Sequence, residues 1–255
     1  MANIHHAAAE GFRAGAANYV VGRPEYPPEI EPWLAHDLGL MVGKTALDLG
    51  AGTGKFTPRL LTTGARVIAV EPVPAMLDQL IRQYPGVEAM SGSAENIPLA
   101  AASVDAVVCA QSFHWFATAE ALHEIHRVLT PGGAFGLIWN VRDETVPWVA
   151  ALTGIMQPFE GDTPRFHSKK WRTVFPAEGF TALREHRFKN WHTGPPEQVI
   201  VDRILSVSFI AALPPAGQQK VAAQLREVIA QTPELAGKAQ VTFPYETLAF
   251  VSNKL

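Results

Sequence analysis

Short apolar runs alternate with amphipathic segments between residues 45 and 140, and this alternation predicts the fold. Five runs read as buried strands: Thr45–Leu49, Arg66–Val70, Val87–Met90, Val104–Ala110 and Ala134–Asn140. Between them, apolar positions three and four residues apart predict helices over Phe56–Thr63, Ala75–Tyr84 and Thr118–Leu129. Strands that alternate with helices form right-handed crossover units around a parallel sheet, and continuously apolar strands are covered on both faces. We therefore expect an α/β fold of the Rossmann-like kind.

The two ends of the chain follow other patterns. The proline tract Arg23–Pro28 must leave helical geometry, and Glu29–Leu40 then predicts a short helix. After residue 141 no clean period runs through Arg142–Lys170. In this last part we expect helices over Trp171–Glu178, Glu197–Ala211 and Pro215–Gln231. We expect strands over Ala182–Trp191 and Val241–Ser252. Pro244 places part of the last strand near a bend or an edge of the sheet.

These patterns predict one domain over residues 1–255, because the two helices between the last two strands look like a cap on the sheet. Within it we expect an N-terminal segment over residues 1–40, a ligand-binding core over 41–140, and a helical cap insertion with the last two strands over 141–255. We find no internal repeat and no low-complexity tract.

Composition narrows the class of protein. With 47% hydrophobic residues and 255 residues, the chain can bury a core without disulfides or metals. A net charge of −3 argues against nucleic-acid binding through a broad basic face. The single cysteine, Cys109, fits a reducing compartment, and no apolar run approaches the ~20 residues of a membrane span. We expect a soluble, cytoplasmic protein that has no membrane or nucleic-acid partner; its oligomeric state cannot be read.

A glycine-rich loop follows the first strand of the core. It reads Asp48-Leu49-Gly50-Ala51-Gly52-Thr53-Gly54 and opens a predicted helix, which is the setting of a nucleotide-type ligand loop. The dinucleotide pattern fails because the third glycine comes one residue early and Lys55 stands in its place. The phosphate-loop pattern fails because Leu49 replaces the first glycine and Phe56 replaces the final Ser or Thr.

Glu71 ends the next strand, 17 residues after Gly54. A carboxylate at the tip of the second strand can accept hydrogen bonds from both hydroxyls of a ribose. The alternative is a solvated charge at a strand end. Together with the loop, Glu71 favours a nucleoside-containing ligand.

At this point the sequence resembles the class I S-adenosylmethionine-dependent methyltransferases. The similarity runs in order through Asp48–Gly54, Glu71, Gly92–Pro98 and Arg127–Gly133, over roughly residues 40 to 140. It is closest to the small-molecule branch that includes trans-aconitate methyltransferase, whose features Tyr19–Pro27, Gln111–Phe116 and Pro244-Tyr245 also resemble. The family implies seven strands with the last antiparallel, helices on both faces, and S-adenosylmethionine as cofactor.

The resemblance also implies roles for individual residues. The glycine loop would pass under the methionine part of the cofactor, Glu71 would bind its ribose, and Gln111 would lie near the transferred methyl group. The set implied to bind the cofactor is Asp48, Gly50, Ala51, Gly52, Gly54, Glu71, Pro72, Met76, Ala94, Glu95 and Gln111. For Met76, simple packing of a helix in the core is an equal alternative.

His114 is the candidate catalytic residue, because it follows a buried strand and stands beside Trp115 and Phe116. It reads equally well as a general base, a hydrogen-bond donor to substrate, or a packed structural residue. A base is needed only for an acceptor that carries a proton at neutral pH, so a carboxylate needs none.

The candidate substrate residues come from three segments. Tyr19, Arg23 and Tyr26 would form a lid, in which an arginine suits recognition of a carboxylate. Trp115 would wall the pocket, and Asn140 and Arg142 would contact substrate at the end of a strand, with Asp143 paired to Arg142. His123 and His126 have the spacing of metal ligands without a third partner, so we expect no metal.

The sequence therefore predicts an enzyme that transfers a methyl group to O, N or carboxylate of a small molecule. An acidic acceptor is favoured if Arg23 binds it. Two alternatives remain open: a non-catalytic protein that binds the cofactor as a sensor or scaffold, and a nicotinamide oxidoreductase, which Lys55 disfavours.

Overall fold

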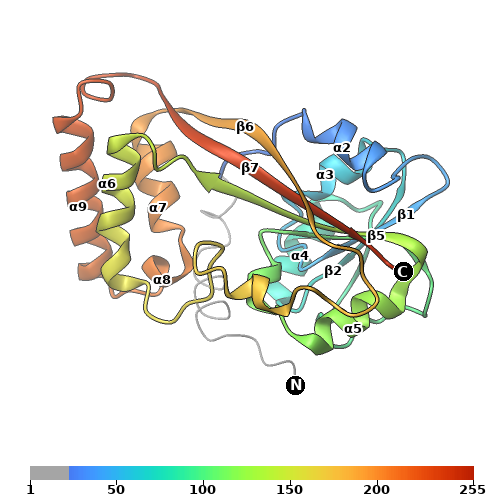
Figure 1. Ribbon diagram of the computed structural model, residues 1–255. Coiled ribbons are helices and arrows are strands. Elements are labelled where there is room, and N and C mark those ends of the chain that lie inside the picture. Colours follow the sequence, from blue (N-terminus) through green and yellow to red (C-terminus); the bar gives the residue numbers. More distant parts are fainter. Residues whose placement is uncertain (1–22) are drawn as a thin grey trace.

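A seven-stranded sheet forms the centre of the protein in the computed structural model, which describes residues 23–255 (Figure 1). The strand order is β3-β2-β1-β4-β5-β7-β6, and β7 alone runs antiparallel to the other six strands. The strands are β1 (Thr45–Leu49), β2 (Arg66–Val70), β3 (Glu88–Met90), β4 (Val104–Ala110), β5 (Leu129–Arg142), β6 (Arg184–Gly194) and β7 (Val241–Asn253). The predicted Rossmann-like, mostly parallel sheet with an antiparallel last strand is confirmed.

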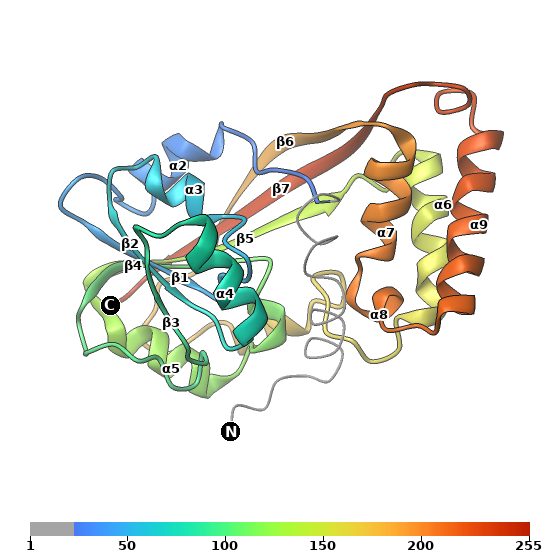
Figure 2. The same ribbon diagram turned by 180° about the vertical axis from the view of Figure 1, so that it is seen from behind.

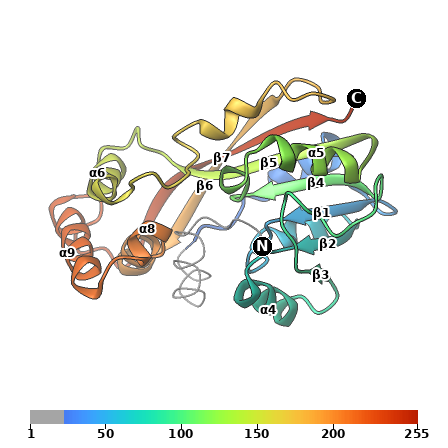
Figure 3. The ribbon, with the colours of Figure 1, turned by 90° about the horizontal axis from the view of Figure 1, so that it is seen from below.

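Helices cover both faces of the sheet, as the apolar strands require. On one face α5 (Ala119–Val128) packs with the 3-10 turn η3 (Lys170–Val174) through Leu122, Ile125 and Trp171. On the other face α2 (Ile30–His36) and α3 (Thr57–Leu61) pack through Ile30, Trp33 and Leu60. The helix α4 (Pro74–Gln83) lies near β3, on the side of the strands opposite α5 (Figure 3).

A separate helical group lies beyond the ends of the long strands β5, β6 and β7 (Figures 1 and 2). It has its own apolar core, in which Leu152, Ile204 and Leu225 pack against Phe243 of β7. Its elements are α6 (Pro147–Met156), the turn η2 (Gln157–Phe159), the π-helical segment η4 (Glu197–Asp202), α7 (Arg203–Leu205), α8 (Ser208–Ala211) and α9 (Pro215–Gln231). Because β5 and β7 run from the sheet into this group, the helices sit beside the carboxyl end of β5.

The register of the sheet brings four strand ends together. β1 pairs in parallel with β2 and β4, and β4 pairs in parallel with β5. The parallel pairing of Leu49 with Val70 and of Ala110 with Ile138 puts the residues that follow these strands at one edge. Open α/β sheets bind ligands at the carboxyl ends of their strands, so this edge is where a site is expected.

Some local expectations were wrong, mostly in the last third. The helix α6 has no counterpart among the predicted elements, because it is apolar on most sides and shows little periodicity. The single helix predicted over Glu197–Ala211 is broken into three pieces. Pro244 lies in an inner strand, but pairing with β5 ends at Tyr245, so Pro244 is locally at an edge.

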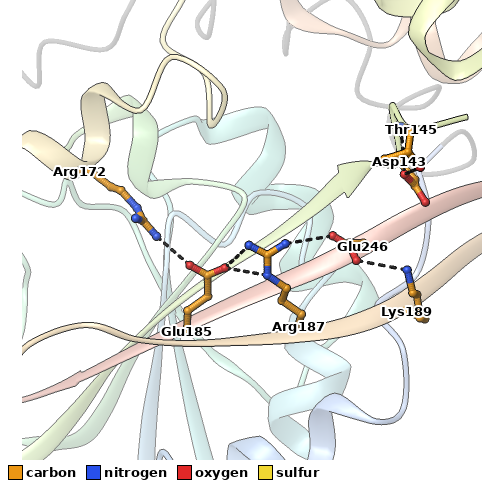
Figure 4. A network of polar contacts seen from close by, with 7 residues as sticks. All are labelled: Asp143, Thr145, Arg172, Glu185, Arg187, Lys189 and Glu246. Carbon is orange, nitrogen blue, oxygen red and sulfur yellow. Dashed lines mark hydrogen bonds and ion pairs between the residues drawn. The ribbon is translucent and has the colours of Figure 1, made fainter. Parts of the chain in front are cut away.

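Charged side chains line the outer strand β6 and its neighbour β7 (Figure 4). Arg172 binds Glu185, Glu185 binds Arg187, and Arg187 and Lys189 both contact Glu246, over 2.7–3.6 Å. Such charges on an edge strand discourage pairing with another chain. Across residues 23–255, no helix is both long and apolar enough to cross a membrane.

Asp143, drawn beside this network, corrects a prediction. Its carboxylate accepts hydrogen bonds from the backbone N–H and the hydroxyl of Thr145, at 3.2 and 2.6 Å (Figure 4). These bonds close the turn after β5 and hold the pKa of Asp143 below its usual range. Asp143 is therefore not the expected partner of Arg142.

Candidate active site

The glycine loop turns sharply from β1 toward α3, and all three of its glycines have positive φ. Gly50 (φ +69°) and Gly54 (φ +85°) are closely packed: an added Cβ would lie 2.8 Å from Ser112 Cβ and 2.7 Å from the Tyr84 ring. Gly52 (φ +60°) is different, because a Cβ there would meet only the Met76 sulfur, at 3.9 Å. The loop is thus held on two sides and open at Gly52, where a ligand can approach the backbone.

Glu71 is buried at the end of β2 and is held by the backbone on both sides. Its Oε2 accepts a hydrogen bond from Gly52 N over 2.8 Å, and Oε1 accepts one from Val73 N over 2.9 Å. Burial raises the pKa of Glu71, against these two bonds. Each oxygen keeps a further acceptor position, so the carboxylate is oriented for two hydroxyl donors.

Asp48 lies near the end of β1, directly before the turn of the glycine loop, and is fully buried. Its Oδ2 accepts a hydrogen bond from the hydroxyl of Thr57 over 2.9 Å. Burial, against the hydrogen bond from Thr57 and with a smaller contribution from the nearby Glu71 carboxylate, raises the pKa of Asp48 to about 7. A cation bound here would be attracted to Asp48 and would favour its ionised form.

Gln111 follows β4 with φ +58°, a backbone region that residues other than glycine seldom adopt. Two hydrogen bonds hold Gln111 in this strained conformation. Its backbone N donates to Ile138 O (2.8 Å), and its side-chain Nε2 donates to Asn140 O (3.0 Å). The side chain is thereby placed between two cavities, and it lines both. Such strain concentrates at functional sites.

The larger cavity encloses about 1250 Å³, part of it open to solvent, along the carboxyl ends of β1, β2 and β4. It brings together ten of the eleven residues predicted to bind the cofactor: Asp48, Gly50, Ala51, Gly52, Glu71, Pro72, Met76, Ala94, Glu95 and Gln111. Gly54 is the exception, because it turns away from the cavity toward Tyr84. The sequence did not point to Ser112, which also lines the cavity and donates a hydrogen bond to Leu49 O over 2.8 Å.

A second cavity, of about 690 Å³, continues from the first toward the helical group. The two share Arg23, Gln111, Trp115, Asn140 and Arg203 as lining residues. The second also contains Arg142 from the end of β5 and Arg165 from the loop after η2. We call this second space the arginine cavity.

Two guanidinium groups of the arginine cavity are buried without full pairing. Arg142 and Arg203 are 7% and 8% exposed, and neither Arg142 Nε nor Arg203 Nε and Nη1 has a hydrogen-bond partner. Burial, with Arg203 nearby, lowers the pKa of Arg142 to about 10. A buried cation without a partner is costly, so this arrangement indicates a site for an anion.

The carboxylates near these arginines do not balance them. Glu160 binds Arg165 over 3.1 Å, and Glu144 lies 4.0 Å from Arg142, with more than a third of its side chain exposed. The guanidinium of Arg165 also lies over the Phe209 ring, with Cζ 5.1 Å from the ring centroid. This contact brings no negative charge to Arg165. Among the described residues, Arg142, Arg165 and Arg203 therefore have two carboxylates near them, one of them distant.

His114 lines the arginine cavity and not the larger one. Its Nδ1 accepts a hydrogen bond from Trp139 Nε1 over 3.1 Å. Burial, with smaller contributions from the nearby Arg165 and Arg23, lowers the pKa of His114 to about 3. A histidine that stays neutral in this way is a poor general base at neutral pH.

Arg23, Pro24 and Tyr26, in the described part of the predicted lid, line the larger cavity, and neighbouring side chains hold the backbone of this segment. The Glu25 carbonyl accepts hydrogen bonds from Asn190 Nδ2 (2.9 Å) and Asn140 Nδ2 (3.3 Å), and the Tyr26 carbonyl accepts one from Arg59 Nη2 (2.6 Å). Tyr26 packs its ring edge-on against Phe56, with centroids 4.7 Å apart. Tyr19, the remaining predicted lid residue, lies outside the described residues.

The side chain of Asn140 also has a structural role, which the sequence did not indicate. Its Oδ1 accepts hydrogen bonds from Asn190 and Thr247, at 3.0 and 2.5 Å, while Nδ2 faces the Glu25 carbonyl. The amide joins the lid segment to β6 and β7, although Asn140 also lines both cavities.

Among residues 23–255, no three His, Cys, Asp or Glu side chains are grouped to hold a metal.

Arg165 and Arg203 were missed by the sequence reading. Arg165 lies in a stretch without periodicity, and only folding brings it to β5. Arg203 did leave a signal, because it stands with Asp202 inside a run, Val199 to Leu205, whose other residues are apolar. A charge within a buried segment is a sign of a paired or functional group.

Comparison with known proteins agrees with this geometry. A methyltransferase domain family matches residues 47–137. An uncharacterised methyltransferase-like protein of Schizosaccharomyces pombe is 42% identical over 95% of both chains, and an uncharacterised methyltransferase of Mycobacterium tuberculosis is 40% identical over 93% of both. The chain belongs to the methyltransferase family.

Solved structures share the fold at low sequence identity. One, from Anabaena variabilis and described as a methyltransferase of an antibiotic biosynthesis pathway, has a TM-score of 0.64 and 19% identity over 94% of this chain and 100% of its own. A geranyl diphosphate methyltransferase in complex with S-adenosylmethionine has a TM-score of 0.51 and 13% identity over 89% of this chain and 85% of its own.

The fold and the family together define a class I S-adenosylmethionine-dependent methyltransferase, and this protein is an enzyme of that class. The larger cavity fits the cofactor chemically: it offers a carboxylate for ribose hydroxyls, an open glycine for close backbone approach, and a buried acid beside the place of a cation.

Proposed function

We propose that the enzyme transfers the methyl group to a carboxylate oxygen of a small acid that carries more than one negative charge. The observation that carries this proposal is the arginine cavity, which joins the cofactor cavity at Gln111 and contains the incompletely paired Arg142 and Arg203. Arginine binds carboxylates through two parallel hydrogen bonds, and it stays charged at any physiological pH.

The cofactor placement is part of the same proposal. Glu71 would accept the ribose hydroxyls, Ala94 and Glu95 would flank the adenine, Met76 would pack on its face, and Gln111 would lie by the methionine end. The lid over residues 1–40, with Tyr26 and Arg23 in its described part, would close over it. S-adenosylmethionine, when bound, supplies an electrophilic methyl group.

The residues of this chain would bind the acid, orient it and exclude water. Arg142, Arg165 and Arg203 would hold the acid and direct one carboxylate toward Gln111. Trp115 and the lid would exclude water from the junction. Alignment of two bound reactants can lower a barrier by about 7–11 kcal/mol, which suits a displacement that needs little other help.

The low pKa of His114 supports a carboxylate as the methyl acceptor over an alcohol or a phenol. Those acceptors require removal of a proton, and a histidine whose pKa lies about 3 cannot hold that proton near pH 7. A carboxylate is already ionised and has no proton to lose. His114 therefore enters the proposal without a role as general base.

The branch of the family belongs to this proposal as well. Trans-aconitate is a tricarboxylic acid, and a cavity lined by four arginines suits such a molecule. The resemblance of Gln111–Phe116 and Pro244-Tyr245 to that branch points in the same direction. Any small acid with two or more carboxylates in reach of Arg142 and Arg203 is a candidate.

The test is transfer of labelled methyl from S-adenosylmethionine to a panel of acids, amines and phenols. The panel contains monocarboxylates, dicarboxylates and trans-aconitate, and the E71A variant serves as a control with impaired cofactor binding. We expect a product that releases methanol in mild base, as methyl esters do, and a preference for acids with two or more charges. Stable label on amines or phenols alone would overturn the proposal.

A further inference from the structure

The contact between Trp139 and His114 decides which nitrogen of the imidazole carries a proton. The indole N–H can only donate, so the hydrogen bond of 3.1 Å makes His114 Nδ1 the acceptor. An acceptor nitrogen has no hydrogen of its own. The single proton of the neutral ring must then be on Nε2.

Trp139 is held too firmly to release this bond. It is 1% exposed, and its ring packs against Trp171, Phe166 and Phe250 with centroids 4.6, 5.1 and 5.9 Å apart. On the other side, the His114 ring packs against Trp115 at 5.1 Å. Neither ring can turn without disturbing several neighbours.

The imidazole faces groups that are cationic or donate hydrogen bonds. Arg23, Arg142, Arg165, Arg203 and His167 line the same cavity, and no carboxylate is among its described lining residues. A second proton on His114 would break the bond from Trp139 and add a charge beside Arg165 and Arg23. The neutral ring with a proton on Nε2 is the form that fits.

We propose that Trp139 is a positioning residue that holds His114 as a neutral imidazole whose Nε2–H donates a hydrogen bond to the bound acid. This rests on the proposed function, because the acid is the group that would accept the bond. With Nδ1 turned to Trp139, Nε2 is the polar atom that His114 offers to the cavity. His114 adds a directed donor to the arginines, so the cavity accepts carboxylate oxygens and disfavours groups that can only donate.

The first measurement is the tautomer of His114 by ¹⁵N NMR of the protein with S-adenosylhomocysteine at pH 7. We expect the Nε2–H form alone in the wild type and both forms in W139F, which keeps a ring but loses the donor. W171F is the matched control: Trp171 packs on Trp139 but donates to Phe166 O instead, at 3.2 Å, so it should keep the wild-type tautomer. An Nδ1–H form or an imidazolium in the wild type, or no change in W139F, would overturn the inference.

The second measurement is kinetic, with the acid from the panel that is methylated fastest. Loss of one donor to a charged group should raise KM about tenfold in H114F, with the Kd for S-adenosylhomocysteine unchanged. H114Q, which keeps an N–H₂ group near the position of Nε2, should recover most of this loss. Equal KM values in H114F and the wild type would refute the donor role even where W139F fails to fold.

The two proposals fail in different ways. If no acid of the panel is methylated, the proposed function is wrong, and the NMR measurement still decides whether Trp139 sets the tautomer. If an acid is methylated and the tautomer is mixed in the wild type, the proposed function stands and the positioning role of Trp139 is wrong.

Discussion

The backbone N–H of Gly52 lies 2.8 Å from Glu71 Oε2, so the loop after β1 orients the acid at the end of β2. The bond joins two residues that are 19 positions apart, one in the loop after β1 and one at the end of β2. The first prediction follows from it.

E71A should weaken binding of S-adenosylhomocysteine by about 10- to 100-fold, because hydrogen bonds to a charged group contribute roughly 1.5–3 kcal/mol. Isothermal titration calorimetry measures the change. E120A, which removes an exposed acid at the start of α5, is the control and should bind as the wild type does. Unchanged affinity in E71A would remove Glu71 from the cofactor site.

Asp48 should make stability depend on pH. Its pKa is raised from 3.8 to about 7 in the folded protein, so the folded state keeps a proton that the unfolded chain releases. Between these pH values the free energy of unfolding falls as pH rises, and the loss is complete above about pH 7.

The comparison of wild type with D48N isolates this effect. From pH 5 to pH 8, the wild type should lose up to about 3 kcal/mol of unfolding free energy relative to D48N, measured by urea denaturation without cofactor. Binding of S-adenosylmethionine at pH 6 should release a proton in the wild type and not in D48N. A constant difference between the two proteins would show that Asp48 is ionised throughout.

R203M should separate substrate binding from stability. The change removes a buried cation whose Nε and Nη1 have no partner, and it keeps most of the side-chain volume. We expect the KM for the acid to rise at least tenfold, while the free energy of unfolding stays the same or increases by about 1–3 kcal/mol.

The control for R203M lies on the same helical group. Arg226 of α9 is exposed and pairs with Glu197 at the surface, so R226M should change neither KM nor stability measurably. A marked destabilisation of R203M would mean that Arg203 supports the fold and not an anion.

The glycines of the loop should respond differently to alanine. G50A places a Cβ 2.8 Å from Ser112 Cβ at a positive φ, and should lower the free energy of unfolding by about 2 kcal/mol or more. G52A meets only the Met76 sulfur at 3.9 Å, so strain of about 1 kcal/mol is expected and the larger loss should be in cofactor affinity. Urea denaturation and calorimetry of both variants check this, and equal losses in both measurements would contradict it.

The core and the cofactor site could be read from the sequence to a large extent. Five apolar runs and a glycine loop lie within residues 45–140, and β1, β2 and β4 begin and end where the runs do. Parallel strands covered on both faces are short, apolar and bounded by loop residues, so their signal is local. Ten of the eleven residues predicted to bind the cofactor line one cavity, because the carboxyl ends of parallel strands must lie at one edge.

The arginine cavity depends on the tertiary structure. Arg142, Arg165 and Arg203 come from a strand end, an aperiodic loop and a broken helix, and nothing in their spacing relates them. The same holds for Trp139 and His114, which are 25 residues apart and share a hydrogen bond through the pairing of β4 with β5. Gly54 shows the converse, since the motif includes it but the fold turns it toward Tyr84.

The sequence by itself determined the class of sheet, the glycine loop and the place of Glu71 at the end of the second strand, because each is encoded in consecutive residues. Only the tertiary structure brought Arg142, Arg165 and Arg203 to one cavity and turned His114 Nδ1 toward Trp139. Such contacts depend on distance and burial in three dimensions: the packing of the helical group at the end of β5 gathers the arginines, and the pairing of β4 with β5 brings His114 to Trp139.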